Sequence, residues 1–408
     1  MMTEHESRYR TVVTGIGFIT PIGNSSAKLQ QHITEGKPAP SHPFISPYSP
    51  GSVVSVFRAA MDEQLAPPSH RDPVVRFGLA AAEKALQDSG LDPETIQSPA
   101  TGAVISSSKG GVNSLSRFYT ACDRENEARL NAHRLYSNFG PECVSGWVAR
   151  RYRLAGPVKS FVTACASGTH ALIAGARMIE DGSVTCCIAG ASDASINPLM
   201  LEGYKRMGVY SRDTIRPFDK ERDGFIVGEG AGILILEERE HARQRGARIY
   251  AEIDSFIDGQ ETGHALHFDI QKNTLAELLR RLCEKNPRRP VDYINAHATG
   301  TQAGDYYETH QIKKAFGRDA VTIPVSSTKS FTGHMLGASG AVEAIICVLA
   351  MQHDFVPPTV SYLRPDRKCD LDHVPNKGRK KKLNRILSLS MGFGGHIAII
   401  SFSKGMYT

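Results

Sequence analysis

Two stretches of the chain share one layout, and this layout constrains the fold more than any other feature. SGTHALIAGARMIEDG (167–182) and ASGAVEAIICVLAMQHD (338–354) each begin with small residues, continue as an apolar helix and end on an acidic residue or turn. Glycine and alanine at the start of such a helix allow its backbone to approach neighbouring elements closely. The recurrence therefore predicts a duplicated α/β unit with one such helix in each half.

Apolar runs and turn residues predict further elements around these two helices. We expect strands at 12–23 (with its Gly/Pro turn), 102–108, from 159 towards Cys165, 185–193, 230–238, 291–301 and 322–330. We expect helices at 24–36, 74–90, 167–182 and 331–354, an irregular segment at 37–73, and a polar helical insertion at 113–150 that covers the core rather than joining it.

Composition excludes several classes of protein. A chain of 408 residues with 41% hydrophobic and 22% charged residues is typical of a soluble globular protein, and a net charge of +6 is too small to predict nucleic-acid binding. The eight cysteines lack zinc-ligand spacing, so we expect neither a bound metal nor a disulfide framework. The N-terminus lacks the layout of a signal peptide, and the apolar run 344–351 is too short to span a bilayer. We therefore expect a cytoplasmic protein in a reducing environment.

One cysteine has the surroundings of a nucleophile. Cys165 lies in VTACASGTH, between an expected strand and the start of an expected helix. Backbone N–H groups at a helix N-terminus lower the pKa of a thiol and can hold an oxyanion. An inert buried cysteine remains an equal alternative from this pattern alone. Cys186, Cys187 and Cys347 lie within apolar elements and are expected in the core, and no catalytic surroundings mark Cys122, Cys143, Cys283 or Cys369.

Two histidines and a lysine follow expected strands. His297 lies in NAHATGT, and His334 lies in STKSFTGHM with Lys329 shortly before it. Strand-to-loop exits are where α/β folds assemble their sites, so a cysteine, two histidines and a lysine at such exits indicate one active site. Because the chain has fifteen histidines, structural or exposed roles for either one remain open. The loop MGFGG (391–395) would supply backbone N–H groups or a mobile gate, or would simply be a tight turn.

The glycines near the N-terminus do not predict a nucleotide site. TGIGFITPIG resembles part of a dinucleotide fingerprint, but the third glycine and the following acidic residue are missing, and the chain has no GxxxxGK[ST] loop.

Six stretches, read in order, resemble the elongating β-ketoacyl-ACP synthases of the thiolase superfamily. They are VVTGIGFITPIG, TACASG, IRPFDKERDGFIVGEGAGILILEE, NAHATGTQAGDYYE, STKSFTGHMLGASGAVEA and MGFGGHIA. The resemblance implies two similarly folded halves in a five-layered α-β-α-β-α core. The first half would be 1–255 with the nucleophile, and the second would be 256–408 with the histidines, the lysine and the gating loop.

The resemblance also implies roles for individual residues. Cys165 would carry the acyl chain as a thioester, His297 and His334 would support malonyl decarboxylation, and Lys329 would organise the site electrostatically. The hydroxyls of Thr299 and Thr301 would hold the phosphopantetheine arm. Phe393 would be a gate, and its N–H would form an oxyanion hole with the N–H of Cys165. Supporting acidic roles would fall to Asp305, Glu308 and Glu343. Thiolases use a second cysteine near the C-terminus, and the MGFGG loop lacks one.

Departures from the family pattern concern the acyl pocket. Lys109 stands where long-chain synthases usually have an apolar residue, so it either turns to solvent or reshapes that pocket. Met391 and His396 replace the usual Phe and Asn, HAT replaces HGT at 297–299, and the loop 258–270 is unlike that of the family. These differences suggest a specialised acyl substrate in fatty-acid or polyketide-like biosynthesis.

The implied partners follow from the same resemblance. Substrates would arrive on the phosphopantetheine of an acyl carrier protein, without a further cofactor, and the protein would be a homodimer or pair with a related synthase. The basic run 377–385, Lys205 and Arg206 are candidate docking residues for the acidic carrier, although a solvated loop is the favoured explanation of the run. Two alternatives are a non-catalytic partner subunit, similar to chain-length factors, and a thiolase or acyltransferase that acts on CoA esters.

Overall fold

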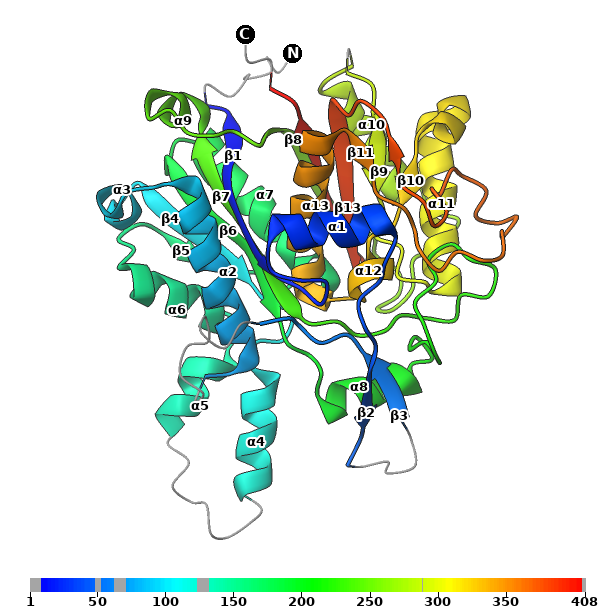
Figure 1. Ribbon diagram of the computed structural model, residues 1–408, viewed down its shortest axis with the longest axis horizontal. Coiled ribbons are helices and arrows are strands. Elements are labelled where there is room, and N and C mark those ends of the chain that lie inside the picture. The colour runs from blue at the N-terminus through cyan, green and yellow to red at the C-terminus, as the bar shows by residue number, and fades with distance from the viewer. Residues whose placement is uncertain (1–8, 48–52, 62–70, 123–131, 288, 406–408) are drawn as a thin grey trace.

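A ten-stranded mixed sheet forms the centre of the computed structural model, which describes residues 9–47, 53–61, 71–122, 132–287 and 289–405. Its strand order is β10-β9-β13-β14-β8-β1-β7-β6-β4-β5 (Figure 1). One half contains β1 (Thr11–Ile19), β4 (Thr101–Ser106), β5 (Val158–Lys159), β6 (Cys186–Asp193) and β7 (Gly230–Glu238). The other contains β8 (Ala251–Gln260), β9 (Tyr293–Asn295), β10 (Val325–Ser326), β13 (Arg385–Gly392) and β14 (His396–Ser403).

The two halves of the sheet have the same topology. In chain order, the first strand of each half (β1 or β8) pairs antiparallel with the last strand of that half (β7 or β14). This last strand also pairs antiparallel with the strand that precedes it (β6 or β13). The remaining two strands then continue the sheet in parallel. The predicted duplication is therefore confirmed in the strand order. The boundary expected after residue 255 falls inside β8, and we propose that the second half begins at β8 instead.

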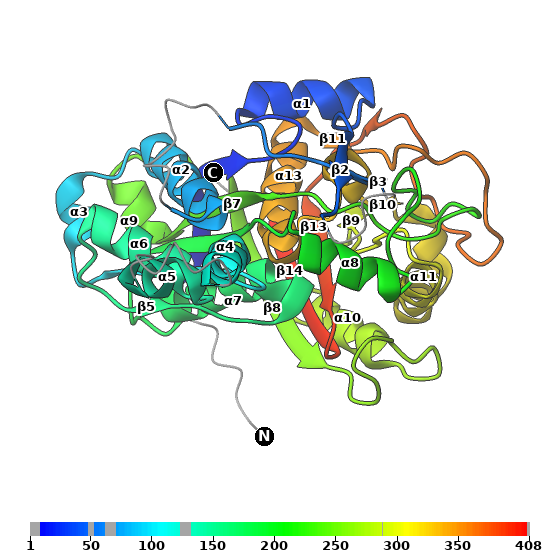
Figure 2. The same ribbon diagram turned by 90° about the horizontal axis from the view of Figure 1, so that it is seen from below.

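Helices occupy three layers around the sheet halves. The central layer between the halves contains α7 (Ser167–Glu180) and α13 (Ser339–His353) (Figure 2). The outer layer on the first half contains α2 (Pro73–Ser89) and α6 (Cys143–Tyr152). The outer layer on the second half contains α10 (Thr274–Glu284) and α11 (Gln302–Phe316). Alternate strand residues face different cores: Ile233 and Ile235 pack with the outer helices, whereas Leu234 and Leu236 pack in the central core. The expected five-layered thiolase-like α/β architecture is confirmed.

The small residues of the two central helices serve close packing, as expected. A Cβ atom on Gly168 of α7 would lie 2.8 Å from the backbone nitrogen of Ala341 in α13. A Cβ atom on Gly340 would lie 2.2 Å from Oγ1 of Thr169. Because no larger side chain fits at either position, the starts of the two helices are held against each other at the centre of the molecule.

Four expectations for individual elements were wrong. The expected helix 331–354 is interrupted: α12 (Lys329–Thr332) ends at Gly333, whose φ of 69° requires glycine, and α13 begins only at Ser339. The segment 37–73 contains a hairpin of β2 (His42–Ile45) and β3 (Val53–Val56). The strand expected before Cys165 ends at Lys159. The insertion forms α4 (Val112–Cys122), α5 (Ala132–Phe139) and α6, but α6 packs in the core; residues 123–131 lie outside the described part.

The N-terminal glycines pack a strand against a helix. Gly15 and Gly17 of β1 face α2, where a Cβ atom on Gly17 would lie 2.1 Å from the carbonyl oxygen of Ala81 and 2.4 Å from the nitrogen of Ala85. These glycines allow close backbone packing, which agrees with the low expectation of nucleotide binding.

We expect Gly17→Ala to lower the free energy of unfolding by about 1–3 kcal/mol, because the added methyl group must push β1 away from α2. Urea denaturation followed by circular dichroism measures this change. The control is Gly146→Ala in α6, where an added Cβ meets nothing within 4 Å and helix propensity favours alanine by up to about 1 kcal/mol. Equal stabilities of the Gly17 variant and the unchanged protein would contradict the packing argument.

One apolar helical stretch, Leu336–His353, is long enough to be compared with a membrane span, but 89% of it is buried inside the protein. It is the core helix α13 with its preceding turn.

Cys186, Cys187 and Cys347 are fully buried, which confirms their expected place in the core. The side chain of Cys122 lies outside the described residues.

Candidate active site

A cavity of about 410 Å³ collects most of the residues singled out in the sequence. Its walls come from both halves of the molecule. The predicted residues that line it are Lys109, Cys165, His297, Thr299, Thr301, His334, Met391 and Phe393. A single, largely apolar cavity with convergent polar groups is the usual form of a small-molecule site.

A strained turn presents Cys165 to this cavity. Ala164 has a φ of 49°, which is rare for a residue with a side chain, and Cys165 follows it in a 3₁₀ turn (Ala164–Ala166) that leads into α7. Leu336 has the same φ of 49° and precedes α13 through an equivalent turn, so the duplicated unit repeats this feature. The position corresponding to Cys165 in the second half is Gly337.

The thiol of Cys165 is in contact with a histidine. His334 Nε2 lies 3.1 Å from Cys165 Sγ, and His334 Nδ1 lies 3.1 Å from the Ser339 hydroxyl at the start of α13. Burial raises the pKa of Cys165 to about 11, although the charges of Lys109 and Lys329 act in the opposite direction. This direction is opposite to the one expected from the helix N-terminus alone, so the resting thiol is protonated at neutral pH.

The backbone around His334 is pinned from both sides. Its N–H donates to the carbonyl of Ile226 at 2.8 Å, and its carbonyl accepts from the N–H of Gly228 at 3.0 Å. The ring of Phe225 packs edge-on against the imidazole, with 5.0 Å between centroids. The segment 225–228 therefore fixes the position of a ring that belongs to the other half of the molecule.

His297 lies beside His334 with 5.6 Å between the two ring centroids. Its side chain is buried although it follows β9 in a loop. Nδ1 of His297 is buried and has no hydrogen-bond partner among the described residues. Burial, followed by the charge of Lys329, lowers the pKa of both histidines well below the usual value, so both rings are neutral at physiological pH.

A buried ion pair lies behind the histidines. Lys329 Nζ donates to Glu343 Oε1 at 2.5 Å, and both side chains are almost completely inaccessible to solvent. Lys329 does not line the cavity, so its charge acts on the two imidazoles through the protein. The second oxygen of Glu343 has no hydrogen-bond partner among the described groups.

Two acidic side chains of α11 hold the loop that carries His297. The carboxylate of Glu308 accepts from the N–H groups of His297 at 2.7 Å and Ala298 at 2.8 Å. Asp305, one turn earlier, accepts from the N–H of Gly300 at 3.1 Å and from that of Phe218 at 2.8 Å. Both residues therefore support the backbone of the loop rather than facing the thiol.

The two threonines lie at the cavity wall next to this loop. Their hydroxyl oxygens, Thr299 Oγ1 and Thr301 Oγ1, are 3.3 Å apart, and both residues are partly exposed. Gln302 and Gly304 continue the wall at the start of α11. Paired hydroxyls in this position can hydrogen-bond an amide-containing ligand that enters from solvent.

The glycine loop is held against the turn of Cys165. A Cβ atom on Gly392 would lie 2.7 Å from the carbonyl oxygen of Thr163 and 3.2 Å from the nitrogen of Cys165, so only glycine fits there. The next residue, Phe393, lines the cavity and is partly buried. The backbone of 392–393 and the N–H of Cys165 are thus brought together, as an oxyanion hole requires.

The residues that depart from the family pattern have different surroundings. Lys109 and Met391 line the cavity, whereas His396 lies outside it with its ring 6.2 Å from that of His170. Tyr204, Phe225 and Phe268 are among the cavity residues that the sequence patterns did not single out. Phe225 lies within the matching segment 215–238 and Phe268 within the unusual loop 258–270, so both could have been found there, whereas no local signal marks Tyr204.

The candidate docking residues divide into two groups. Lys205 and Arg206 end α8 (Pro198–Arg206), directly before the cavity residues Met207 and Gly208. The basic run 377–385 contains β12 (Arg379–Lys380), which pairs with β11 (Phe355–Val356), and none of its residues lines the cavity. Its side chains are engaged within the chain: Arg379 with Asp372, and Lys381 with the carbonyl of Asp292.

Comparison with known proteins gives the same family from sequence and from structure. The models for the N-terminal and C-terminal domains of β-ketoacyl synthase match residues 9–242 and 250–363. A 3-oxoacyl-[acyl-carrier-protein] synthase 2 of Coxiella burnetii is 37% identical, covering 97% of this chain and 98% of its own length. The tetracenomycin polyketide synthase ketoacyl synthase alpha subunit of Streptomyces glaucescens is 34% identical over 97% of this chain and 96% of its own.

Solved structures agree with these relatives. A type II polyketide ketosynthase, solved with its acyl-carrier protein and bound to a hexaketide, superimposes with a TM-score of 0.87 at 30% identity, covering 97% of this chain and 99% of that one. The ishigamide ketosynthase/chain length factor gives a TM-score of 0.89 at 27% identity and the same coverage. This chain therefore belongs to the β-ketoacyl synthase family of the thiolase superfamily, and it is an acyl-transferring condensing enzyme of fatty-acid or polyketide biosynthesis.

Proposed function

We propose that Cys165 takes an acyl group from the phosphopantetheine thiol of an acyl carrier protein and that the site then joins it to a decarboxylated malonyl unit. One observation carries the proposal: the thiol, 3.1 Å from Nε2 of His334, shares a cavity with His297, a second neutral histidine. In acylation, Sγ attacks the thioester carbonyl, the bond from that carbon to the pantetheine sulfur breaks, and the thiol proton passes to the departing sulfur.

Condensation uses the histidines. When Ser339 donates to Nδ1 of His334, the proton of the neutral ring is on Nε2 and can donate to the enolate oxygen that forms as malonyl loses CO₂. His297 would donate to the same oxygen. The enolate carbon bonds to the acyl carbon, the bond from that carbon to Sγ breaks, and the resulting thiolate regains a proton. The N–H groups of Cys165 and Phe393 would hold the carbonyl oxygen meanwhile.

The carrier protein would dock beside α8 and deliver its arm past Thr299 and Thr301. Arg206 is exposed at the end of α8, next to the cavity residue Met207, and its charge suits an acidic carrier. The basic run 377–385 is a weaker candidate because part of its charge is used within the chain. No further cofactor enters this chemistry, and we expect the protein to act in the cytoplasm.

The edge of the sheet supports pairing with a second copy or a related chain. β5 is the edge strand of the first half, and Val158, Phe161 and Val162 at and after it are 39%, 37% and 53% exposed. An uncovered edge strand with exposed apolar side chains is a surface that another chain can cover. We propose a homodimer, or a heterodimer with a related synthase, through this edge.

Incubation of the purified protein with a panel of acyl carrier proteins is expected to add one acyl mass, and peptide mapping is expected to find it on Cys165. The other described cysteines should stay unmodified; Cys143, Cys186 and Cys347, for example, are buried away from the cavity. The proposal fails if no carrier acylates the protein, as in a non-catalytic partner subunit. It also fails if acetyl-CoA acts without a carrier, as expected for a thiolase.

A further inference from the structure

The cavity beside Cys165 contains a lysine that is part of its wall. Lys109 lines the cavity, and its Nζ donates to the hydroxyl of Ser108 at 2.9 Å. The same ammonium lies 5.7 Å from the centre of the Tyr204 ring, and Tyr204 also lines the cavity. Of the two arrangements left open by the sequence, the structure has Lys109 facing the pocket.

A buried carboxylate holds this polar wall in place. Asp193, which is 1% exposed, accepts hydrogen bonds from the Ser108 backbone N–H at 3.1 Å, from the Ser108 hydroxyl and from the Ser195 hydroxyl at 2.5 Å. Ser108 thereby links the carboxylate to Lys109. The lysine charge is balanced inside the protein, and its position is fixed by a connected set of hydrogen bonds.

The lysine remains a cation with capacity for a ligand. Burial lowers the pKa of Lys109, but the Tyr204 hydroxyl and the Asp193 carboxylate act in the opposite direction, and the net direction is upward. An ammonium has three N–H donors, and the described wall provides Ser108 and Tyr204 as partners. A third donor is therefore available for an oxygen atom of a bound acyl chain.

The rest of the pocket is mostly apolar. Met207, Val209, Phe225, Phe268 and Met391 line it together with the polar pair. A saturated acyl chain that entered this pocket would place methylene groups against the Lys109 ammonium. The free N–H group of Lys109 would then lose its contact with water without gaining a hydrogen bond. A chain with an oxygen at that point would satisfy it.

Resting on the proposed function, we propose that Lys109 and Tyr204 select acyl chains that carry an oxygen acceptor, either a keto oxygen or a carboxylate, within a few carbons of the thioester. Saturated chains of equal length are disfavoured. The two groups are specificity-determining residues for the acyl-transfer step, and they act on the chain after it enters the cavity rather than on the carrier protein that delivers it.

The test compares three six-carbon chains on the same carrier: hexanoyl, 3-oxohexanoyl and 5-carboxypentanoyl. The second-order rate constant for acylation of Cys165 is measured by intact mass. We expect the unchanged protein to react at least about 10-fold faster with one or both oxygenated chains than with hexanoyl, as one charge-assisted hydrogen bond allows. The faster of the two oxygenated chains shows whether the site recognises a keto oxygen or a carboxylate.

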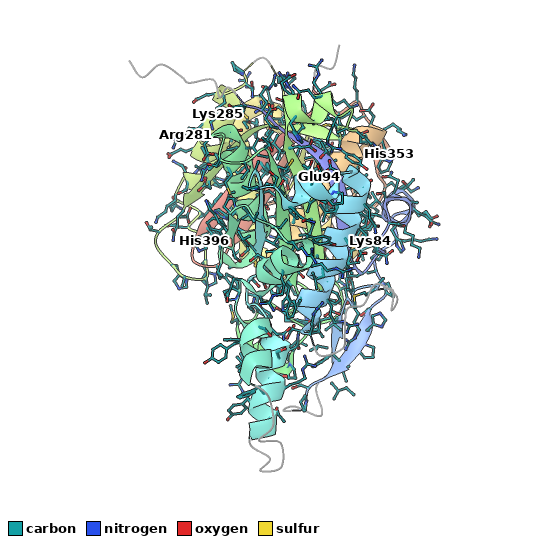
Figure 3. The ribbon with its side chains drawn as sticks, turned by 90° about the vertical axis from the view of Figure 1, so that its left-hand side faces the viewer. Lys84, Glu94, Arg281, Lys285, His353 and His396 are labelled. Carbon is teal, nitrogen blue, oxygen red and sulfur yellow. The ribbon has the colours of Figure 1, made fainter. Side chains whose placement is uncertain are left out.

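The variants are Lys109→Met, which keeps the length of the side chain without its charge, and Tyr204→Phe. Lys109→Met is expected to slow acylation by the preferred oxygenated chain roughly 10- to 100-fold more than acylation by hexanoyl, since the loss of a charge that lowers the pKa of Cys165 affects all chains alike. Tyr204→Phe should act in the same direction with a smaller effect. Lys84→Met, on α2 at the face of the molecule in Figure 3, is the matched control and should leave all three rates unchanged.

The outcomes separate the two proposals. If the natural protein acylates on Cys165 but prefers hexanoyl, or if Lys109→Met and Tyr204→Phe keep its preference, the selection proposed for Lys109 and Tyr204 is wrong and the condensing function stands. If no chain acylates Cys165 in the natural protein, the proposed function fails and this inference fails with it. Retained hexanoyl acylation in Lys109→Met shows that the variant is folded.

Discussion

Cys165→Ala is expected to abolish condensation, with a loss on the order of 10⁴-fold or more, because no other described residue that lines the cavity has a thiol to form the thioester intermediate. The same variant should still release CO₂ from a malonyl carrier, since His297 and His334 remain in place and neither depends on the thiol for its position. The two activities are measured separately, condensation by mass spectrometry of the carrier-bound product and decarboxylation by the loss of the malonyl mass.

The control for this experiment is Cys283→Ala. Cys283 is only partly buried, lies on α10 and does not line the cavity, so its replacement should leave both activities unchanged. Condensation retained by Cys165→Ala would remove the basis of the proposed mechanism. Loss of decarboxylation along with condensation would show that the two histidines do not act independently of the thiol.

Sequence patterns predicted residues that the structure brings together at one cavity, because local features place these residues. Strand β9 ends at Asn295, two residues before His297, and α7 begins directly after the turn of Cys165. When a residue directly follows a buried strand or precedes a buried helix, that element fixes the position of the adjacent backbone. The position of the side chain is therefore also restricted. Spacing also explains Asp305 and Glu308, which lie one turn apart at the start of α11 and face the same loop.

Other features depended on contacts between distant segments and could not be read locally. The apolar pattern after Phe331 continues through His334, yet Gly333 breaks the helix and the backbone of His334 joins residues 226–228 instead. The direction of the Lys109 side chain depends on Ser108, Asp193 and Tyr204, which are up to 95 residues away along the chain. Burial likewise decides the pKa of Cys165, and burial is a property of the whole fold.

Lys329→Met is expected to damage both stability and catalysis, because it leaves Glu343 buried without its partner. Breaking a buried pair on one side typically costs about 3–5 kcal/mol of folding free energy. Thermal and urea unfolding measure this cost. A double variant, Lys329→Met with Glu343→Leu, removes both charges and should recover most of the lost stability, which separates the effect on folding from the effect on the active site.

Catalysis should respond differently from stability. The charge of Lys329 is, after burial, the main cause that lowers the pKa of His297 and of His334. Its removal raises both pKa values, so the rings become protonated at a higher pH than in the natural protein. The acid limb of the condensation rate, which should lie well below pH 6.5 in the natural protein, is therefore expected to move upward in the single and double variants alike.

The double variant makes the comparison decisive because a purely structural role predicts a different result. If Lys329 only stabilises the fold, the double variant should recover activity together with stability, and its pH profile should match that of the natural protein. If the charge of Lys329 holds the histidines neutral, stability returns while the acid limb remains shifted. Lys329→Arg with Glu343 intact is the matched charge control: a cation is kept near the imidazoles, so wherever this variant folds its acid limb should stay at the natural position.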